Sequence, residues 1–158
     1  MSIREVELAD CESLHRNCLS GNTLEQVRAG IERATAESAR GEMAVLVAID
    51  GTEVVGCIQV SRNPHRLKRQ RAELSDFVIH PSARGHGLAR RLTVAAATWA
   101  RSQGCRILEI DARGDTHAED VYRALGFTEH GRLSGGLDDN GTVYDQVSFS
   151  LAIGSWLG

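Results

Sequence analysis

A turn in the middle of the chain carries residues suited to binding a phosphate group. The apolar run Phe77-Val78-Ile79 ends at Pro81 and is followed by Arg84-Gly85-His86-Gly87-Leu88-Ala89, where a long helix is expected to begin. The first backbone N–H groups of a helix have no intrahelical partners, and the helix dipole favours negative charge at that end. A strand, a glycine-containing turn and a helix N-terminus in this order therefore predict an anion site.

Two carboxylates are placed where they could exchange protons with a ligand bound at this turn. Glu73 lies eleven residues before Arg84, at the start of the strand, and six residues of strand cover about 20 Å. Asp111 is expected at the end of the next parallel strand, and two nearby carboxylates raise each other's proton affinity. The alternatives are a solvated Glu73 paired with Arg71 and a turn or cap role for Asp111. Strand alternation places Asp76 on the face opposite Glu73, which makes it a poorer candidate.

Several other kinds of site find no support. The chain lacks the Gly-x-x-x-x-Gly-Lys-Ser/Thr loop of nucleoside triphosphatases, and its mid-chain glycines do not follow a first strand as a dinucleotide site requires. His80 and His86 have no common zinc spacing, so no metal is expected, and no Gly-x-Ser-x-Gly elbow indicates a serine hydrolase. Cys57 and Cys105 fall in or beside predicted strands, which argues against a covalent cysteine route.

Two segments together resemble the GCN5-related N-acetyltransferase (GNAT) family. Arg84-x-x-Gly87-x-Ala89 matches the family's coenzyme A pyrophosphate loop, Gln/Arg-x-x-Gly-x-Gly/Ala. The segment Asp115-x-x-Ala118-x-x-x-Tyr122-x-x-x-Gly126-Phe127 is similar to its second motif, although the family has asparagine where Asp115 stands. Both matches lie within residues 72–132, in family order and spacing. The neighbourhoods of Glu73 and Asp111 look most like the tabtoxin-resistance type of small-molecule acetyltransferase.

The resemblance implies acetyl-CoA as co-substrate, without a metal. It implies that Tyr122 is the general acid for the departing coenzyme A sulfur and that Glu73 is the general base. Asp111, from its expected place at the end of the next strand, could share the site directly or through water. The residues it assigns to cofactor binding are Phe77, Val78, Ile79, Arg84, Gly85, His86, Gly87, Leu88, Ala89, Arg90, Asp115 and Tyr122.

The acceptor is expected to be a primary amine of a small cationic molecule, because the C-terminal half is rich in carboxylates. Residues 133–144 are interpreted as a loop that could close over such a substrate. A protein or peptide N-acetyltransferase with an open groove stays an alternative within the same class. A catalytically silent acetyl-CoA-binding sensor module is the alternative from another class.

The elements needed to position these residues alternate along the chain. Strands are predicted at residues 3–8, 43–49, 53–61, 72–79, 106–112, 127–133 and 143–152. Helices are predicted from residue 11, over residues 24–40, from residue 88 to Gly104, and around Tyr122. The result is one α/β (α+β) domain over residues 1–158: a mostly antiparallel twisted sheet with a central parallel pair and about four helices, which the resemblance identifies with the acyl-CoA N-acyltransferase fold.

Short local signals define several of these boundaries. They are an Asp10 N-cap, an Asp50-Gly51 hairpin turn, a left-handed Gly104 after the long helix, and capping boxes at Thr23 with Gln26 and at Thr116 with Glu119.

Whole-chain properties fit a domain of this kind. The 158 residues carry 18 Lys and Arg against 21 Asp and Glu, a net charge of −3, so no global positive field favours nucleic acid. The one basic cluster, within residues 62–71, is interpreted as a solvated loop. No apolar run is long enough to span a membrane and the N-terminus is charged. The four cysteines have no disulfide or metal spacing, which favours a reducing cytoplasm. Both a monomer and a homodimer are compatible with the sequence.

Overall fold

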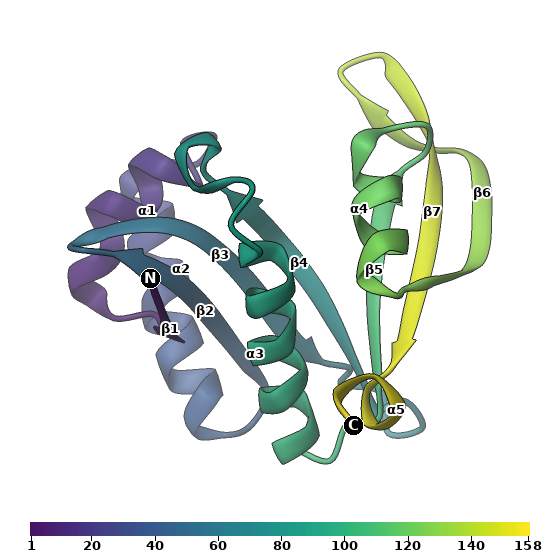
Figure 1. The fold of residues 1–158 in the computed structure, drawn as a ribbon, viewed down its shortest axis with the longest axis horizontal. Coiled ribbons are helices and arrows are strands. Elements are labelled where there is room, and N and C mark those ends of the chain that lie inside the picture. The colour runs from purple at the N-terminus through teal and green to yellow at the C-terminus, as the bar shows by residue number, and fades with distance from the viewer.

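The protein is built on one seven-stranded sheet in the order β1-β2-β3-β4-β5-β7-β6 (Figure 1), and the computed structural model describes all residues 1–158. The strands are β1 (Ser2–Glu5), β2 (Met43–Asp50), β3 (Glu53–Arg62), β4 (Arg71–Ile79), β5 (Ile107–Arg113), β6 (Thr128–Asp139) and β7 (Thr142–Ala152). The helices are α1 (Cys11–Asn17), α2 (Leu24–Ala39), α3 (Leu88–Ser102), α4 (His117–Leu125) and α5 (Ile153–Leu157), with short 3-10 turns at Leu8–Asp10 and Pro81–Ala83.

The central pair of strands, β4 and β5, is parallel, and every other pair is antiparallel. This confirms the predicted mixed sheet. The parallel pairing is short, since it joins only Arg71 to Ile107, Ala72 to Leu108 and Glu73 to Glu109. Beyond Glu73 the two strands diverge, and Figure 1 shows the sheet opening there into a V.

A bulge in β4 lies just beyond the last of these pairs. Cys57 of β3 opposes Val78 and Gln59 opposes Ser75, so Ile58 between them faces two residues, Asp76 and Phe77. The backbone of Asp76 takes a left-handed conformation, with φ of 46°. The extra residue shifts the alternation of side chains along the rest of β4.

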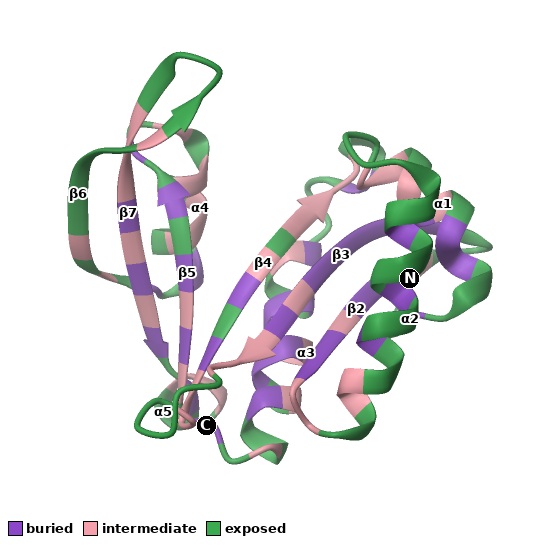
Figure 2. Cartoon of the chain, turned by 180° about the vertical axis from the view of Figure 1, so that it is seen from behind, coloured by how far each residue is buried: buried purple, intermediate pink, exposed green.

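Two hydrophobic cores cover the two faces of the sheet. One packs α3, α4 and α5 against β3, β4, β5 and β7, and includes Ala72 and Leu74 of β4. The other packs α1 and α2 against β2 and β3 around Leu14, Ile31 and Val47. Figure 1 shows α3 and α4 in front of the sheet, and the view from behind in Figure 2 shows α1 and α2 on the other side.

Some of the predicted helix-end signals form as expected, and in others the capping side chain binds a different partner. Thr23 and Gln26 form the predicted capping box at the start of α2, and Gly104 is left-handed after α3. The Asp10 carboxylate does not cap α1. It accepts two hydrogen bonds from Arg4, at 2.7 and 2.9 Å, and one from the Glu7 backbone N–H (2.8 Å), the last as part of a capping box on the 3-10 turn Leu8–Asp10. The capping box predicted at Thr116 is also wrong, because Thr116 Oγ1 donates to the Arg113 carbonyl (2.6 Å).

Two turn predictions are corrected as well. Asp50 pairs with Glu53, so the hairpin turn consists of Gly51 and Thr52 rather than Asp50 and Gly51. Residues 133–144, interpreted as a loop that could close, belong instead to the hairpin of β6 and β7, which pair down to Asp139 and Thr142. A register shift between Leu133 and Leu137 is the irregular part of that hairpin.

Candidate active site

The turn before α3 presents a row of free backbone amides. Gly85 and Gly87 have φ values of 81° and 71°, which other residues rarely adopt. The amides of Gly85, His86 and Gly87 donate to no acceptor within the chain, and the first bond of α3 runs from Arg91 N–H to the Gly87 carbonyl (3.2 Å). Gly87 is the N-cap and has no side chain to satisfy the first turn of the helix. These donors converge where the helix dipole is positive, as an anion requires.

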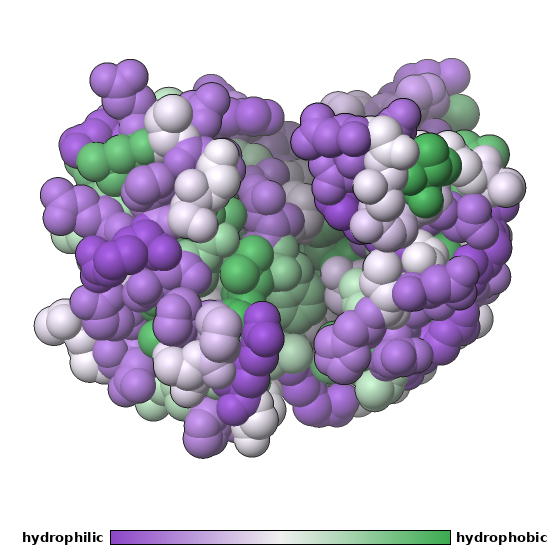
Figure 3. Space-filling model, turned by 90° about the horizontal axis from the view of Figure 1, so that it is seen from above, coloured by the Kyte–Doolittle hydropathy of each residue, from purple (hydrophilic) through white to green (hydrophobic).

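A cavity of about 520 Å³ extends from this turn along β4 to α4. Figure 3 shows the hollow between the two halves of the molecule, with hydrophobic side chains at its base. The lining residues are Phe77, Ile79, Ala83, Arg84, Gly85, Gly87, Leu88, Ala89, His117, Ala118, Val121 and Tyr122. The cavity is thus apolar along its length and polar at the turn, which suits a ligand with an anionic head and a slender neutral arm.

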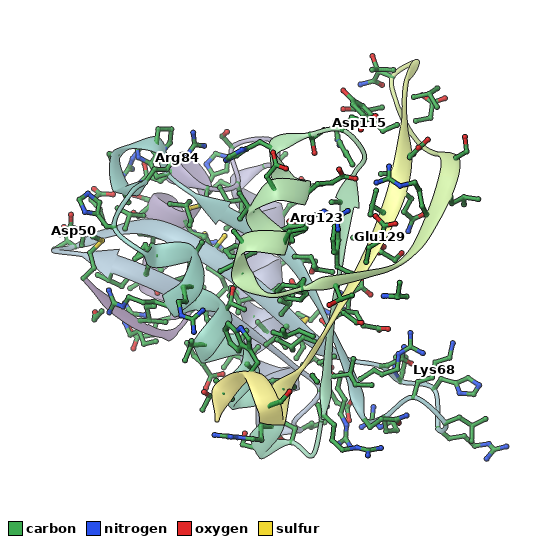
Figure 4. All side chains as sticks on the ribbon, turned by 45° about the vertical axis from the view of Figure 1, so that its right-hand side comes forward. Asp50, Lys68, Arg84, Asp115, Arg123 and Glu129 are labelled. Carbon is green, nitrogen blue, oxygen red and sulfur yellow. The ribbon has the colours of Figure 1, made fainter.

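Four of the residues assigned to cofactor binding do not line this cavity. Val78 packs against the core under α1 and α2, and the His86 side chain is exposed on the turn. The Arg90 guanidinium lies over the Trp156 ring, 5.0 Å from its centroid. Asp115 sits on the turn before α4 with φ of 57°, at the same end of the molecule as Arg84 (Figure 4).

Tyr122 closes the inner end of the cavity. Its ring stacks on Phe77, with centroids 6.4 Å apart and planes 13° apart, and meets Phe149 edge-on at 5.9 Å. Burial raises the pKa of its hydroxyl above the ordinary value of 10.0. The hydroxyl makes no hydrogen bond with another residue of the chain and is therefore free to act on a ligand.

Glu73 and Asp111 lie near each other on the opposite face of the sheet. The neighbours of each in its strand, Ala72 and Leu74 on β4 and Ile110 and Ala112 on β5, belong to the core under α3 and α4, so the two carboxylates face the other way. Desolvation raises the pKa of Glu73, and the charges of Asp111 and Glu109 raise it further.

Contacts correct two details of the alternatives for these acids, and the Glu73 side chain is exposed. Arg71 forms its ion pair with Glu109, so Glu73 is not paired with it. Asp111 is neither a cap nor a turn residue: it lies within β5 and accepts hydrogen bonds from Gln146 (2.8 Å) and Ser148 (2.9 Å) of β7.

β4 and β5 diverge close to the residues that the two faces carry. Tyr122 belongs to the face of α3 and α4, Glu73 and Asp111 belong to the face of α1 and α2, and the strands that separate them are no longer paired beyond Glu73. Beyond Glu73, therefore, no β4–β5 hydrogen bonds lie between the face that carries Tyr122 and the face that carries the two carboxylates.

Asp76 and His117 are placed differently from what the sequence suggested. The bulge adds one residue to β4, so Asp76 falls on the same face as Glu73, contrary to the prediction from alternation. His117, the first residue of α4, lines the cavity but was not singled out. The sequence signal that could have identified His117 is its position next to Ala118 in the second motif.

No metal cluster and no disulfide is found elsewhere in the chain. No group of three His, Cys, Asp or Glu side chains could hold a metal ion, and all four cysteines are free. None of the helices is both long and apolar enough to cross a membrane. The basic loop around Lys68 projects from the end of the molecule opposite Arg84 (Figure 4).

Comparison with curated proteins gives partial matches. An uncharacterized N-acetyltransferase from the hisH-hisA intergenic region of Azospirillum brasilense is 43% identical over 56 residues, 35% of this chain and 33% of that protein. N-alpha-acetyltransferase 30 of Saccharomyces cerevisiae is 26% identical over 80 residues, 50% of this chain and 46% of that protein. The matched stretches thus span between a third and a half of these relatives' own length.

Solved structures match over nearly the whole chain. The crystal structure of ribosomal-protein-alanine N-acetyltransferase from Brucella melitensis superimposes with a TM-score of 0.83 at 23% identity, covering 96% of this chain and 99% of that one. The structure of yncA, a putative acetyltransferase from Salmonella typhimurium with its cofactor acetyl-CoA, gives 0.81 at 20% identity, covering 97% and 94%. These likenesses confirm the fold. The sequence model of the acetyltransferase (GNAT) family matches residues 8–127, and the chain belongs to that family.

Proposed function

We propose that this protein transfers the acetyl group of acetyl-CoA directly to a primary amine. The observation that carries the proposal is the apolar cavity that runs from the free amides of the turn to the Tyr122 hydroxyl, with Glu73 on the other face of the sheet where the pairing of β4 and β5 ends. Family membership supports the same activity.

The residues present fit acetyl-CoA. The unpartnered amides of residues 85–87 and the first turn of α3 suit a pyrophosphate, and Arg84 adds a positive charge beside them. No heavy atom lies within 4 Å of a Cβ built on Gly85 or Gly87, so the space in front of this backbone is open to a ligand. Phe77, Ile79 and Val121 supply apolar walls for a pantetheine arm. When bound, acetyl-CoA supplies the thioester that the amine attacks.

The chain supplies the proton transfers. Glu73 accepts a proton from the ammonium before the attack, or from the amine nitrogen as it attacks, directly or through water, and its raised pKa makes it a stronger base than an ordinary carboxylate. Tyr122 gives its proton to the departing sulfur, and its raised pKa keeps the hydroxyl protonated at neutral pH. Asp111 raises the proton affinity of Glu73 and adds negative charge on the acceptor side.

For the acceptor we propose a small cationic amine. The side of the sheet that it would approach carries Glu73, Asp111 and Glu109, and only Glu109 is neutralised by an arginine. A protein N-terminus stays the second candidate. Two observations favour it: the names of the Saccharomyces and Brucella relatives, and the β6–β7 hairpin, which pairs as strands rather than folding over the site.

The test is release of coenzyme A thiol over a panel of acceptors at saturating acetyl-CoA. The panel contains polyamines, aminoglycosides, amino-acid amides and short peptides with free N-termini. Turnover with small amines supports the proposal, and turnover confined to peptides supports the second candidate. Thermal stabilisation by acetyl-CoA without transfer to any amine would instead indicate a sensor module and refute both.

A further inference from the structure

A second, smaller cavity lies on the α1–α2 face of the sheet. It has a volume of about 90 Å³. Its floor is apolar and includes Leu14, Val27 and Ile31, and its rim carries the polar side chains Asn22, Gln59 and Asp76. None of these residues lines the cavity assigned to acetyl-CoA.

The two cavities lie back to back across the bulge in β4. Asp76 lines the small cavity, and the next residue, Phe77, lines the large one and stacks on Tyr122. The Cys57 thiol donates to the Asp76 carbonyl (3.2 Å) and so ties the bulge to β3. The small cavity is therefore next to the place where β4 and β5 part.

Glu73 faces the same side of the sheet as this cavity. Gln59, on the cavity rim, is in register with Ser75, and Glu73 lies two residues further along β4, about 7 Å along the strand. An amine close enough to Glu73 to lose its proton would thus have the cavity within reach of a short substituent.

Gly30 borders the cavity from α2. It is a glycine in a helix of 16 residues, where glycine is a poor choice, and its φ is not one that demands glycine. A Cβ built on Gly30 would have no heavy atom within 4 Å. Gly30 is exposed and also lines the cavity, so a larger side chain here would stand at the cavity's edge.

Resting on the proposed function, we propose that this cavity selects the acceptor by size: it receives a short uncharged branch on the carbon that bears the amine, and Gly30 keeps it open. A volume of about 90 Å³ admits only a small group. An aromatic branch needs more, since benzene occupies an engineered cavity of about 150 Å³. Methyl to isopropyl branches fit, and a benzyl branch does not.

The experiment measures kcat/KM for glycinamide, alaninamide, valinamide and phenylalaninamide at saturating acetyl-CoA. The wild-type protein is expected to prefer alaninamide and valinamide over phenylalaninamide by at least about tenfold, the discrimination typical of a hydrophobic pocket. Gly30→Leu is expected to lower kcat/KM for valinamide by at least about tenfold. Glycinamide has no branch, so its rate should stay within about twofold.

The matched control is Ala29→Leu, one residue earlier on α2, exposed and not part of the cavity lining. Leucine favours helix over glycine, so Gly30→Leu should fold with an unchanged or higher melting temperature. Acetyl-CoA affinity should be unchanged in both variants, because the cofactor cavity is on the other face.

The possible outcomes distinguish failure of this inference from failure of the proposed acetyl transfer. If the amine panel shows transfer but kcat/KM is indifferent to branch size, or Gly30→Leu slows glycinamide as much as valinamide, the size-selecting cavity is refuted and the activity stands. Transfer to other amines but to none of the four amides refutes it equally. No transfer to any amine refutes the proposed function itself.

Discussion

Replacing Tyr122 by phenylalanine removes one oxygen atom and leaves the ring in place. The stacking on Phe77 and the edge-on contact with Phe149 depend on the ring alone. Since the hydroxyl has no partner within the chain, its loss leaves no group unpaired, and we expect the free energy of unfolding to change by less than about 0.5 kcal/mol. Removing the whole ring would be different, because truncating an aromatic core residue to alanine costs about 3–5 kcal/mol.

The expected effect of Tyr122→Phe is on turnover. A positioned general acid contributes about 10²–10⁴-fold to rate. At about 1.36 kcal/mol for each factor of ten, its loss raises the barrier by about 2.7–5.4 kcal/mol. The affinity for acetyl-CoA should stay within about twofold, because the apolar wall of the cavity is preserved.

The assay combines initial rates of thiol release with calorimetric titration of acetyl-CoA. A low kcat with unchanged Kd and unchanged melting temperature is the expected pattern. Equal kcat in the two proteins would remove Tyr122 from the proton transfer. A large rise in Kd without a fall in kcat would show that the hydroxyl holds the cofactor and does not donate the proton.

Three further changes test other parts of the site and the fold. Asp111→Asn removes a charge that raises the pKa of Glu73. Glu73 then stays deprotonated to lower pH, so the acid limb of the pH profile of kcat/KM should shift to lower pH. An unshifted acid limb would show that the two acids are not coupled. Gly87→Val places a β-branched residue at φ of 71° and should raise the Kd of acetyl-CoA at least about tenfold. The control Gly21→Val, in open space at an ordinary φ, should leave that Kd unchanged. Equal Kd values for the two variants would contradict the role of the turn in binding acetyl-CoA. Thr23→Ala removes the side-chain cap of α2 and should cost about 0.5–2 kcal/mol in a denaturant titration, with acetyl-CoA affinity unchanged; full stability would mean that the box contributes nothing.

The features that the sequence predicted well are those set by neighbouring residues. The turn from Pro81 to Gly87 and the helix after it depend on chain-local chemistry: a proline, two glycines and an amphipathic stripe. The capping box of Thr23 and Gln26 is likewise closed within four residues. The side chains of Thr23 and Gln26 have no competing partner elsewhere in the chain.

The predictions that failed did so where a distant side chain offered a better partner. Arg132, from β6, forms an ion pair with Glu119, the residue expected to close a capping box with Thr116. Arg4, from β1, similarly takes the carboxylate of Asp10, whose pKa is lowered mainly by that hydrogen bond. A charged hydrogen bond with a fork of donors is stronger than a neutral cap, but its partner can be identified only once the strands are in place.

The bulge at Asp76 is the least predictable feature and the one on which the site depends most. In a regular strand, Phe77 and Ile79 would share the face of Glu73, because side chains repeat every second residue. The inserted residue moves them to the face of α3 and α4, where they line the cavity and where Phe77 meets Tyr122. One strand therefore carries Glu73, the proposed base, on one face and an apolar wall of the cavity on the other. The same extra residue places Asp76 on the side of α1 and α2, where it lines the small cavity. A single bulge therefore determines both the wall of the acetyl-CoA cavity and the rim of the cavity that we propose selects the amine.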